Sequence, residues 1–285
     1  MISSASESSI QAAVAQISNK KTKFELACQD LSLGMQKWPI WLMLGYQDIK
    51  LRYRRSILGP FWITLSMAIT VYSMGFLYSH LFHNDVSSYF PFLTAGMLAW
   101  ALISTAIMEL TEGFTNCDNL IKQIKLPYSL YIHRMVWKNI LIFLHNLIVI
   151  LPILVIFHQS AKVNFYSLAL LPNLALVYVN AFFYGLILAM IGARYRDLSQ
   201  MVKSLVQVVF FLTPVLWNPS LLPERYQLWI AVNPFYAFVE LLRAPMIGQP
   251  VPLIEYAIAL GVTLLGILIS LLMFSKYRSR IVYWL

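Results

Sequence analysis

The chain has 285 residues, of which 59% are hydrophobic and only 12% are charged, and its mean hydropathy is +0.68. Soluble domains carry about twice this charged fraction, so the composition excludes an ordinary soluble domain. The net charge of +9 would suit a nucleic-acid partner, but the basic residues gather in short segments between long uncharged stretches, which instead indicates a membrane topology signal.

The N-terminal residues 1–35 are expected to form a cytoplasmic tail. The first thirty are polar and rich in Ser, Ala and Gln, which is typical of a mobile or loosely helical terminus. They contain no apolar core of the kind found in signal peptides, so no cleaved leader is expected.

A helix over residues 37–58 is predicted to lie in the membrane interface. Apolar side chains recur every three or four residues along one face: Trp38, Leu42, Tyr46, Ile49, Tyr53 and Ile57. Arg52, Arg54 and Arg55 occupy other faces, which suits aromatic rings at headgroup depth and cations near lipid phosphates. Gly59-Pro60 then breaks the helix before the first span.

Six apolar stretches follow, and roughly 20 such residues in a helix cross the hydrocarbon layer of a bilayer. Lipid offers the backbone no hydrogen bonds, so stretches of this length should be helical. The six are Phe61–Phe82, Tyr89–Met108, Ile140–Phe157, Leu168–Ala193, Ser199–Trp217 and Tyr256–Phe274. The predicted fold is an all-α membrane protein with six transmembrane helices over residues 61–274 and a tail at 275–285.

The distribution of basic residues predicts the orientation. Of the 21 Lys and Arg residues, all but Lys162, Arg225 and Arg243 fall on one side of the six stretches. Basic residues concentrate on the cytoplasmic side of a membrane, so both termini are expected in the cytoplasm. Cys28 and Cys117 then lie on the reducing side, where no structural disulfide is expected.

Two connections are too long or too apolar for simple turns. The loop between the second and third spans contains Asn119–Lys125, which reads as a short amphipathic helix stopped by Pro127. Between the fifth and sixth spans, Asn218–Pro252 is apolar but interrupted by Pro219, Pro223, Pro234 and Pro245, so no piece is long enough to span. Short re-entrant helices that dip into the outer leaflet would fit this segment.

The sequence lacks familiar catalytic motifs. It has no GxxxxGK[ST] phosphate loop, no HExxH and no paired-cysteine site, so no catalytic residue, metal site or cofactor is expected in this chain. Aromatic residues, in contrast, make up 14% of it. The interfacial belt of any membrane protein explains most of them, but aromatic faces also stack on sugar rings. Candidates for lining a glycan path are Tyr72, Phe76, Phe210, Phe211 and Trp217.

Five segments resemble, in order, the permease subunits of ABC-type polysaccharide exporters. They are DIKLRYRRSILGPFW (Asp48–Trp62), NLIKQIKLP (Asn119–Pro127), ARYRDL (Ala193–Leu198), FLTPVLW (Phe211–Trp217) and NPFYAFVELLRAPMIG (Asn233–Gly248). The resemblance covers roughly residues 36–280, and the last two segments look most like the O-antigen branch. The Ser-rich N-terminal tail is not part of the pattern.

The resemblance implies a machine in which two permease copies form a channel above two copies of a separate ATPase subunit, which binds ATP and Mg. The residues expected to face that ATPase are Leu120, Ile121, Ile124, Lys125, Arg196 and Asp197. For the two second-loop residues, Arg196 and Asp197, an ordinary basic loop with a local ion pair remains open. Arg52, Arg54 and Arg55 would lie near the pyrophosphate of an undecaprenyl-diphosphate-linked glycan, although a plain membrane anchor suits each of them equally.

The resulting functional hypothesis is export of lipid-linked O-antigen from the cytoplasm to the periplasm across a bacterial inner membrane. The expected contacts are membrane lipids, the glycan, the ATPase and a second copy of the chain, with no nucleic acid. Alternatives are the same machinery serving teichoic acid or capsule, and a small-molecule efflux permease of the same superfamily. A membrane-bound sugar-modifying enzyme would need an acidic or histidine cluster at one membrane face, and none is evident in the sequence.

Overall fold

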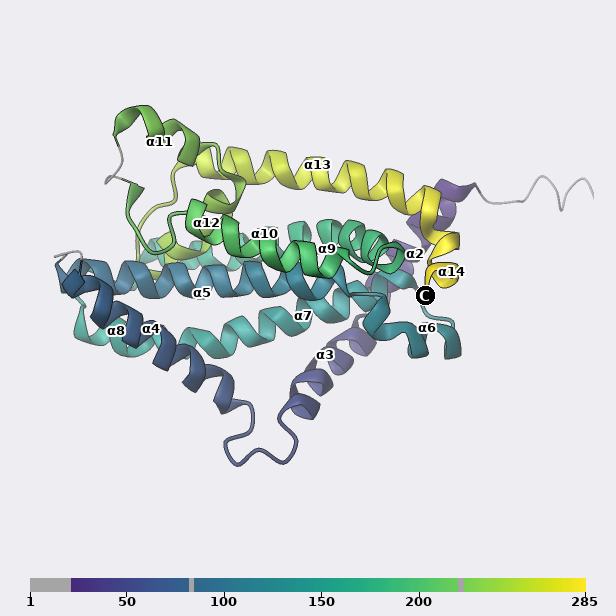
Figure 1. Cartoon of the computed structure of the whole chain (residues 1–285), viewed down its shortest axis with the longest axis horizontal. Coiled ribbons are helices and arrows are strands. Elements are labelled where there is room, and N and C mark those ends of the chain that lie inside the picture. The colour runs from purple at the N-terminus through teal and green to yellow at the C-terminus, as the bar shows by residue number, and fades with distance from the viewer. Residues whose placement is uncertain (1–21, 82–84, 220–222) are drawn as a thin grey trace, which may run out of the picture.

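The computed structural model describes residues 22–81, 85–219 and 223–285, and every regular element in these ranges is helical (Figure 1). The predicted all-α class is therefore confirmed. The elements are α2 (Lys23–Gln36), α3 (Trp38–Arg52), α4 (Phe61–Leu81), α5 (Val86–Thr111), η1 (Thr115–Cys117), α6 (Asp118–Gln123), α7 (Tyr128–Asn146), η2 (Leu147–Val149), α8 (Ile150–Ile156), η3 (Phe165–Ala169), α9 (Leu170–Arg194), α10 (Leu198–Leu212), α11 (Glu224–Ala231), α12 (Pro234–Met246), α13 (Leu253–Tyr277), η5 (Arg278–Arg280) and α14 (Ile281–Trp284).

Five helical segments are long and apolar enough to cross a membrane, which identifies an integral membrane protein. They are Phe61–Leu81, Val86–Thr111, Tyr128–Ile156, Phe165–Arg194 and Leu253–Trp284. Each overlaps a predicted span, although the end of the first at Phe82 lies outside the described residues. Figure 1 shows α5, α7, α9 and α13 running along one axis, with α4 inclined to them. α6 and α14 lie at one end of this bundle, called here the α6 end, and α8 and α11 lie at the other, the α11 end.

The predicted fifth span, Ser199–Trp217, is shorter than expected. Its helix, α10, has 15 residues and ends at Leu212, which gives a length of ~22 Å against the ~30 Å of a bilayer core. The helix stops because Thr213, whose backbone is extended, precedes Pro214, and the residue before a proline is sterically disfavoured in the α conformation.

The predicted third span begins earlier than expected, because α7 starts at Tyr128 rather than at Ile140. The sequence pattern suggested a loop because charged residues occur before Ile140. In the folded chain two of them are paired inside the bundle: Arg134 with Asp48, and Lys138 with Glu109. Because both cations have carboxylate partners, they can be buried among the helices of the bundle. The charged segment is therefore the first part of α7 and not a loop.

Both terminal segments are more ordered than expected. Residues 23–36 form α2, which begins with a capping box between Thr22 and Glu25 and packs against α7 and α13. The buried carboxylate of Asp30 attaches α2 to the start of α7 by accepting from the Ser129 N–H at 3.0 Å. At the other end, Ile281 is fully buried, so the expected tail at 275–285 is also folded onto the bundle. Residues 1–21 lie outside the described residues.

The predicted interface helix over residues 37–58 is also shorter than expected. It ends at Arg52, and Arg55 has a φ of 72°, a left-handed conformation that interrupts a helix. Figure 1 shows α3 and α4 leaving the bundle and meeting at a turn that projects from its side. Trp41, Gly45 and Ile49 face α7, so the apolar stripe does not lie on one exposed face: Ile49 is buried, whereas Trp38, Tyr46 and Ile57 are exposed.

Two short helices, α11 and α12, connect α10 to α13, in agreement with the short helices predicted within Asn218–Pro252; residues 220–222 of that segment lie outside the described residues. Arg243 of α12 is 1% exposed and donates to the Pro214 carbonyl at 2.8 Å and to Glu240. Its guanidinium also lies 4.0 Å from the centre of the Phe92 ring of α5. This one side chain therefore ties α12 to the end of α10 and to α5.

Candidate functional site

A polar pocket of about 340 Å³ lies at the α6 end of the bundle. Its walls come from the C-terminal end of α5 and the residues that follow it, from the start of α6, from the turn between α9 and α10, and from the last two residues of the chain. Asp118 and Arg196 both line it, so two segments that are far apart in the sequence lie together here. The pocket is a concave polar surface that a partner protein could enter.

The residues expected to face an ATPase differ in accessibility. Ile124 and Lys125 follow α6 and are exposed, and Leu120 is partly exposed. Arg196 and Asp197 are exposed in the turn between α9 and α10. Ile121, however, is buried in the core, because one side of a short amphipathic helix must face inward. With 9% of its surface exposed, Ile121 offers a partner little contact area in this structure.

Contacts around the pocket hold its walls together. Lys203 of α10 pairs with Glu112 at 3.2 Å, and the Arg194 guanidinium lies 5.7 Å from the centre of the Trp284 ring. Close by, burial raises the pKa of the Cys117 thiol, because the thiolate would lose its hydration. Among residues 22–81, 85–219 and 223–285, no three His, Cys, Asp or Glu side chains gather closely enough to hold a metal ion.

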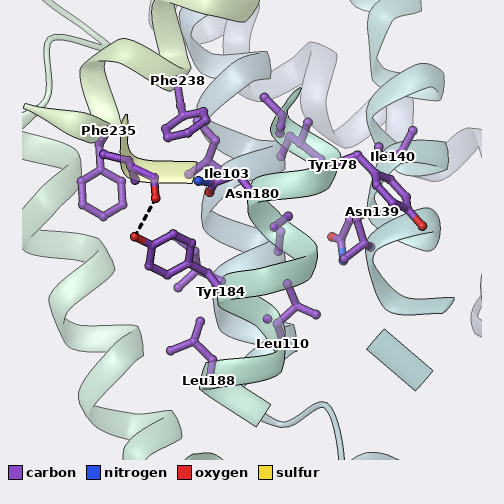
Figure 2. Close-up of a pocket in the computed structure, with 18 of the residues that line it drawn as sticks. Ile103, Leu110, Asn139, Ile140, Tyr178, Asn180, Tyr184, Leu188, Phe235 and Phe238 are labelled. Atoms are coloured by element: carbon purple, nitrogen blue, oxygen red, sulfur yellow. Dashed lines mark hydrogen bonds between the residues drawn. The ribbon is translucent and has the colours of Figure 1, made fainter. Parts of the chain in front are cut away.

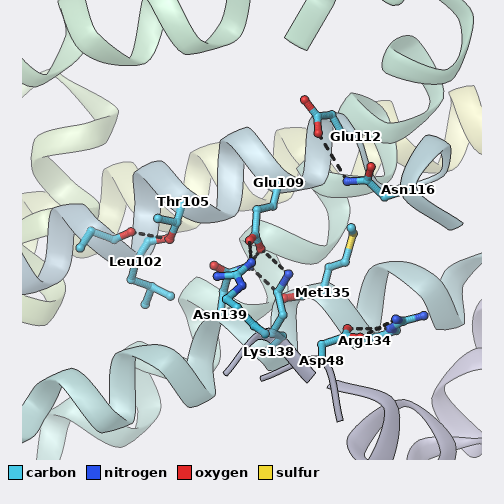
Figure 3. A network of polar contacts seen from close by, with 12 residues as sticks. Asp48, Leu102, Thr105, Glu109, Glu112, Asn116, Arg134, Met135, Lys138 and Asn139 are labelled. Carbon is cyan, nitrogen blue, oxygen red and sulfur yellow. Dashed lines mark hydrogen bonds and ion pairs between the residues drawn. The ribbon is translucent and has the colours of Figure 1, made fainter. Parts of the chain in front are cut away.

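A second polar site joins α3, α5 and α7 through Glu109 (Figure 3). One carboxylate oxygen of Glu109 accepts from the Lys138 ammonium and the Asn139 amide, each at 2.8 Å. The other oxygen accepts from Arg52 at 3.1 Å. The carboxylate thus meets two cations and an amide, which compensates for its removal from water.

The same site explains how α3 is held against the bundle. Both carboxylate oxygens of Asp48 accept from Arg134, the Oδ2 contact with Nε being 2.7 Å, in a bidentate pair. Arg52, expected near lipid pyrophosphate, instead has Glu109 as a partner, although half of its side chain is exposed. Arg54 and Arg55 are exposed in the projecting turn. Sequence reasoning missed Glu109 and Lys138 because their partners are distant in the sequence.

Four of the five aromatic candidates for a glycan path lie on two helices, α4 and α10, that each pack against α5. On α4, Tyr72 donates to the Val149 carbonyl at 2.7 Å, while Phe76 is exposed. On α10, Phe210 lies against Trp100 of α5, with 5.5 Å between the ring centres, and Phe211 is exposed. Trp217 is half-buried beyond α10. Within one chain, the exposed rings therefore belong to separate helices.

Comparison with known proteins places these features in context. The sequence profile of the ABC-2 type transporter family matches residues 40–247. The chain is similar to the O-antigen export system permease protein RfbA of Myxococcus xanthus, with 24% identity over 77% of this chain and 85% of that one. It is also similar to the protein of the same name from Klebsiella pneumoniae, with 23% identity over 84% of this chain and 92% of that one.

Proposed function

Because the chain belongs to the ABC-2 type transporter family, we propose that it is the membrane-spanning permease subunit of an ATP-driven exporter of lipid-linked O-antigen. The observation that carries this proposal is the near full-length similarity to two permeases named for O-antigen export. Transport would run from the cytoplasm to the periplasm of a bacterial inner membrane, and a separate ATPase subunit would bind ATP and Mg.

The path of the chain supports six crossings with both termini in the cytoplasm. α10 runs from the α6 end, where Lys203 pairs with Glu112, toward the α11 end, where the Tyr89 hydroxyl donates to the Leu216 carbonyl at 2.7 Å. With the extended residues after Leu212, it would form a short fifth crossing. The described N-terminal helix α2 and the marked C-terminus both lie at the α6 end (Figure 1), which would then face the cytoplasm.

The polar pocket at the α6 end supports docking of two ATPase subunits, one below each of two permease copies. Movement can pass between proteins only through a physical contact. Exposed Ile124 and Lys125 after α6, with partly exposed Leu120 in α6, offer a surface for this contact. Arg196 and Asp197, exposed in the turn between α9 and α10, extend it. Arg196 lines the pocket with Asp118, so a partner loop could press on both segments together.

The projecting turn supports recognition of the lipid anchor. Arg54 and Arg55 are exposed there, and guanidinium groups bind diphosphate oxygens in a bidentate manner. Arg52 would share its charge between Glu109 and such an anion. The glycan would follow a channel between two copies of the chain, where Tyr72, Phe76, Phe210, Phe211 and Trp217 would offer aromatic faces to the sugar rings.

Deletion of the chain from its natural host tests the proposal. Completed polymer should accumulate in the cytoplasm on its undecaprenyl-diphosphate anchor, and surface polymer should return when the wild-type chain is restored. The chain should also co-purify with an ATPase whose activity responds to the lipid-linked glycan. Polymer that still reaches the surface of the deletion strain would contradict the proposal, and the chemistry of any trapped polymer distinguishes O-antigen from teichoic acid or capsule.

A further inference from the structure

A cavity of about 410 Å³ lies inside the bundle, between α5, α7 and α9 and beside α12 (Figure 2). Protein interiors are close-packed, and the few voids that they contain seldom exceed a water molecule. This volume instead falls within the range of ligand pockets. The cavity is separate from the polar pocket at the α6 end and from the aromatic residues assigned to the glycan path.

The walls of the cavity are apolar. Ile103, Ala106 and Leu110 line it from α5, Ala181 and Leu188 from α9, and Phe238 from α12. The tyrosine hydroxyls and the Asn180 amide that reach the cavity are already engaged. Tyr184 donates to the Val262 carbonyl at 3.1 Å, Asn180 donates to Thr263 at 3.1 Å, and the Tyr178 hydroxyl meets His133 at 2.6 Å. An apolar cavity with satisfied polar groups disfavours water.

One polar atom in the wall is not engaged. The Asn139 amide nitrogen donates to Glu109 and to the Met135 carbonyl, but its Oδ1 is buried and has no hydrogen-bond partner among the described residues. Figure 2 places Asn139 at the edge of the cavity, and the residue is 2% exposed. A buried acceptor without a donor is costly. The cavity therefore combines a long apolar part with one polar edge, which suits an amphiphilic molecule.

The surroundings identify the source of such a molecule. α5, α7, α9 and α13 all belong to segments that cross the membrane, so the medium around the cavity is lipid hydrocarbon. The cavity is not sealed, since Ile107 of α5 and Leu188 of α9 both line it and are only half-buried. We propose that this cavity binds a hydrocarbon chain of a membrane lipid, with a donor group of the lipid or a water near Asn139.

The bound chain would lie between α5 and α9, which touch each other directly nearer the α6 end. There a Cβ on Gly192 of α9 would lie 1.9 Å from the Thr111 carbonyl oxygen of α5. At the wall of the cavity itself, a Cβ on Gly185 would lie 2.8 Å from Leu110, and both of these residues line the cavity. α5 leads toward α6, and α9 leads to the turn that holds Arg196. The lipid chain thus fills the space between α5 and α9 on the side of the Gly192 contact away from the α6 end. These are the two helices that lead to α6 and to the Arg196 turn.

Photo-crosslinking in a bilayer tests the proposal on the full chain. The protein is reconstituted in vesicles of phosphatidylethanolamine and phosphatidylglycerol that contain a phosphatidylglycerol with a diazirine on one acyl chain. After illumination, adducts are mapped by mass spectrometry. We expect adducts on cavity residues such as Ile103 and Leu188, in addition to adducts on Leu264, which is exposed on the outer face of α13.

A substitution that fills the cavity should remove only the inner adducts, meaning those on cavity residues such as Ile103. Ala181→Phe places a ring in the cavity and should abolish labelling of Ile103, whereas Ala257→Phe on the exposed face of α13 is the matched control and should not. Labelling of Leu264 that persists in both variants shows that the fold is retained. If Ala181→Phe does not fold, Leu188→Trp fills the cavity from another position. Adducts confined to outward faces, or inner adducts that survive filling, would overturn the proposal.

A competition arm identifies the type of chain. Polyprenyl phosphate is added at increasing concentration before illumination. Loss of the cavity adducts with retention of those on Leu264 assigns the site to a prenyl chain, and retention of both assigns it to the acyl chain of a phospholipid. The proposal requires only that the protein lies in a membrane. Its test therefore does not depend on whether the exported molecule is O-antigen.

Discussion

Glu109 of α5 and Lys138 of α7 form an ion pair of 2.8 Å within two segments that cross the membrane. The Lys138 side chain is 10% exposed, so its charge has few alternatives to this partner. Asn139 donates to the same carboxylate (Figure 3). Arg52 donates to it as well, which connects α3 to the bundle. The projecting turn with Arg54 and Arg55 is therefore positioned partly by a polar network inside the protein.

The substitution Glu109→Gln should destabilise the chain, because it leaves Lys138 buried without a counter-charge. We expect a loss of about 3 kcal/mol in the free energy of unfolding, the lower end for a broken buried pair because Glu109 is partly exposed. Arg52→Gln removes a half-exposed partner and should cost only ~0–1 kcal/mol. Thermal unfolding of the detergent-purified variants measures both, and equal losses would contradict this ranking. The double variant Glu109→Gln/Lys138→Gln should recover part of the loss.

Ile121 in α6 and Ile124 at its C-terminal end should respond differently to the same substitution. Ile124→Asp alters an exposed position, so the thermal midpoint should stay near that of the wild type while ATPase co-purification and surface polymer decrease. Ile121→Asp places a carboxylate in the core and should prevent stable folding, at a cost of several kcal/mol. Normal export by Ile124→Asp would argue against a docking role for this segment.

Two glycines provide a matched test of the contact between α5 and α9. Gly192→Ala should destabilise the protein, because the new Cβ would lie 1.9 Å from the Thr111 carbonyl oxygen. Gly261→Ala, in α13 with open space around it, should stabilise the helix by about 0.5–1 kcal/mol. Thermal midpoints of the two variants should therefore move in opposite directions, and a shift in the same direction would refute the close contact.

The two cysteines should differ in reactivity toward maleimide. Cys117 is buried and its thiol pKa is raised, so less of the reactive thiolate is present at neutral pH, whereas Cys28 is partly exposed. Cys28 should therefore react faster when each is left alone by Cys117→Ser or Cys28→Ser. Raising the pH should increase the Cys117 rate, because more of its thiol ionises. A membrane-impermeant maleimide should label Cys28 in inverted vesicles but not in intact cells if the α6 end is cytoplasmic.

The carboxylate of Asp30 should contribute substantially to the stability of the α6 end. It accepts from the Ser129 N–H at 3.0 Å, which satisfies one of the free donors at the start of α7, and from Arg278 at 2.8 Å. Asp30→Ala should cost about 2 kcal/mol, the upper value for a helix cap, since the carboxylate is buried. Glu25→Ala removes an exposed capping contact and should cost less. Calorimetry that shows no difference would contradict this assignment.

The extent of agreement between sequence and structure depends on the type of signal. Apolar stretches located five crossing segments well, because their length must match the hydrocarbon layer whichever helices surround them. Proline signals were also informative, since the short helices α11 and α12 lie where the proline-rich segment predicted them. The apolar pattern alone places the end of this helix at Trp217, whereas α10 ends at Leu212 because Pro214 disfavours the α conformation at Thr213.

The sequence pattern of charged residues is a poorer guide to the structure than the pattern of apolar residues. Arg134 and Lys138 suggested a loop, yet both lie in α7 and are paired with carboxylates on other helices. The partner of Arg134, Asp48, is 86 residues away in the sequence, so no local pattern indicates it. Likewise, no local pattern indicates that Arg52 has Glu109 as a partner, 57 residues away, while its contact with a lipid pyrophosphate stays a prediction.

The sequence by itself therefore determined that this protein lies in a membrane, that it is helical and approximately where its crossing segments occur. These properties follow from the free energy of transfer of each segment into lipid, which adds up along the chain. Only the tertiary structure decided which polar groups are paired, that Ile121 faces the core and that a cavity lies between α5 and α9. Those properties depend on which helix faces meet, and this is set by packing among segments distant in the sequence.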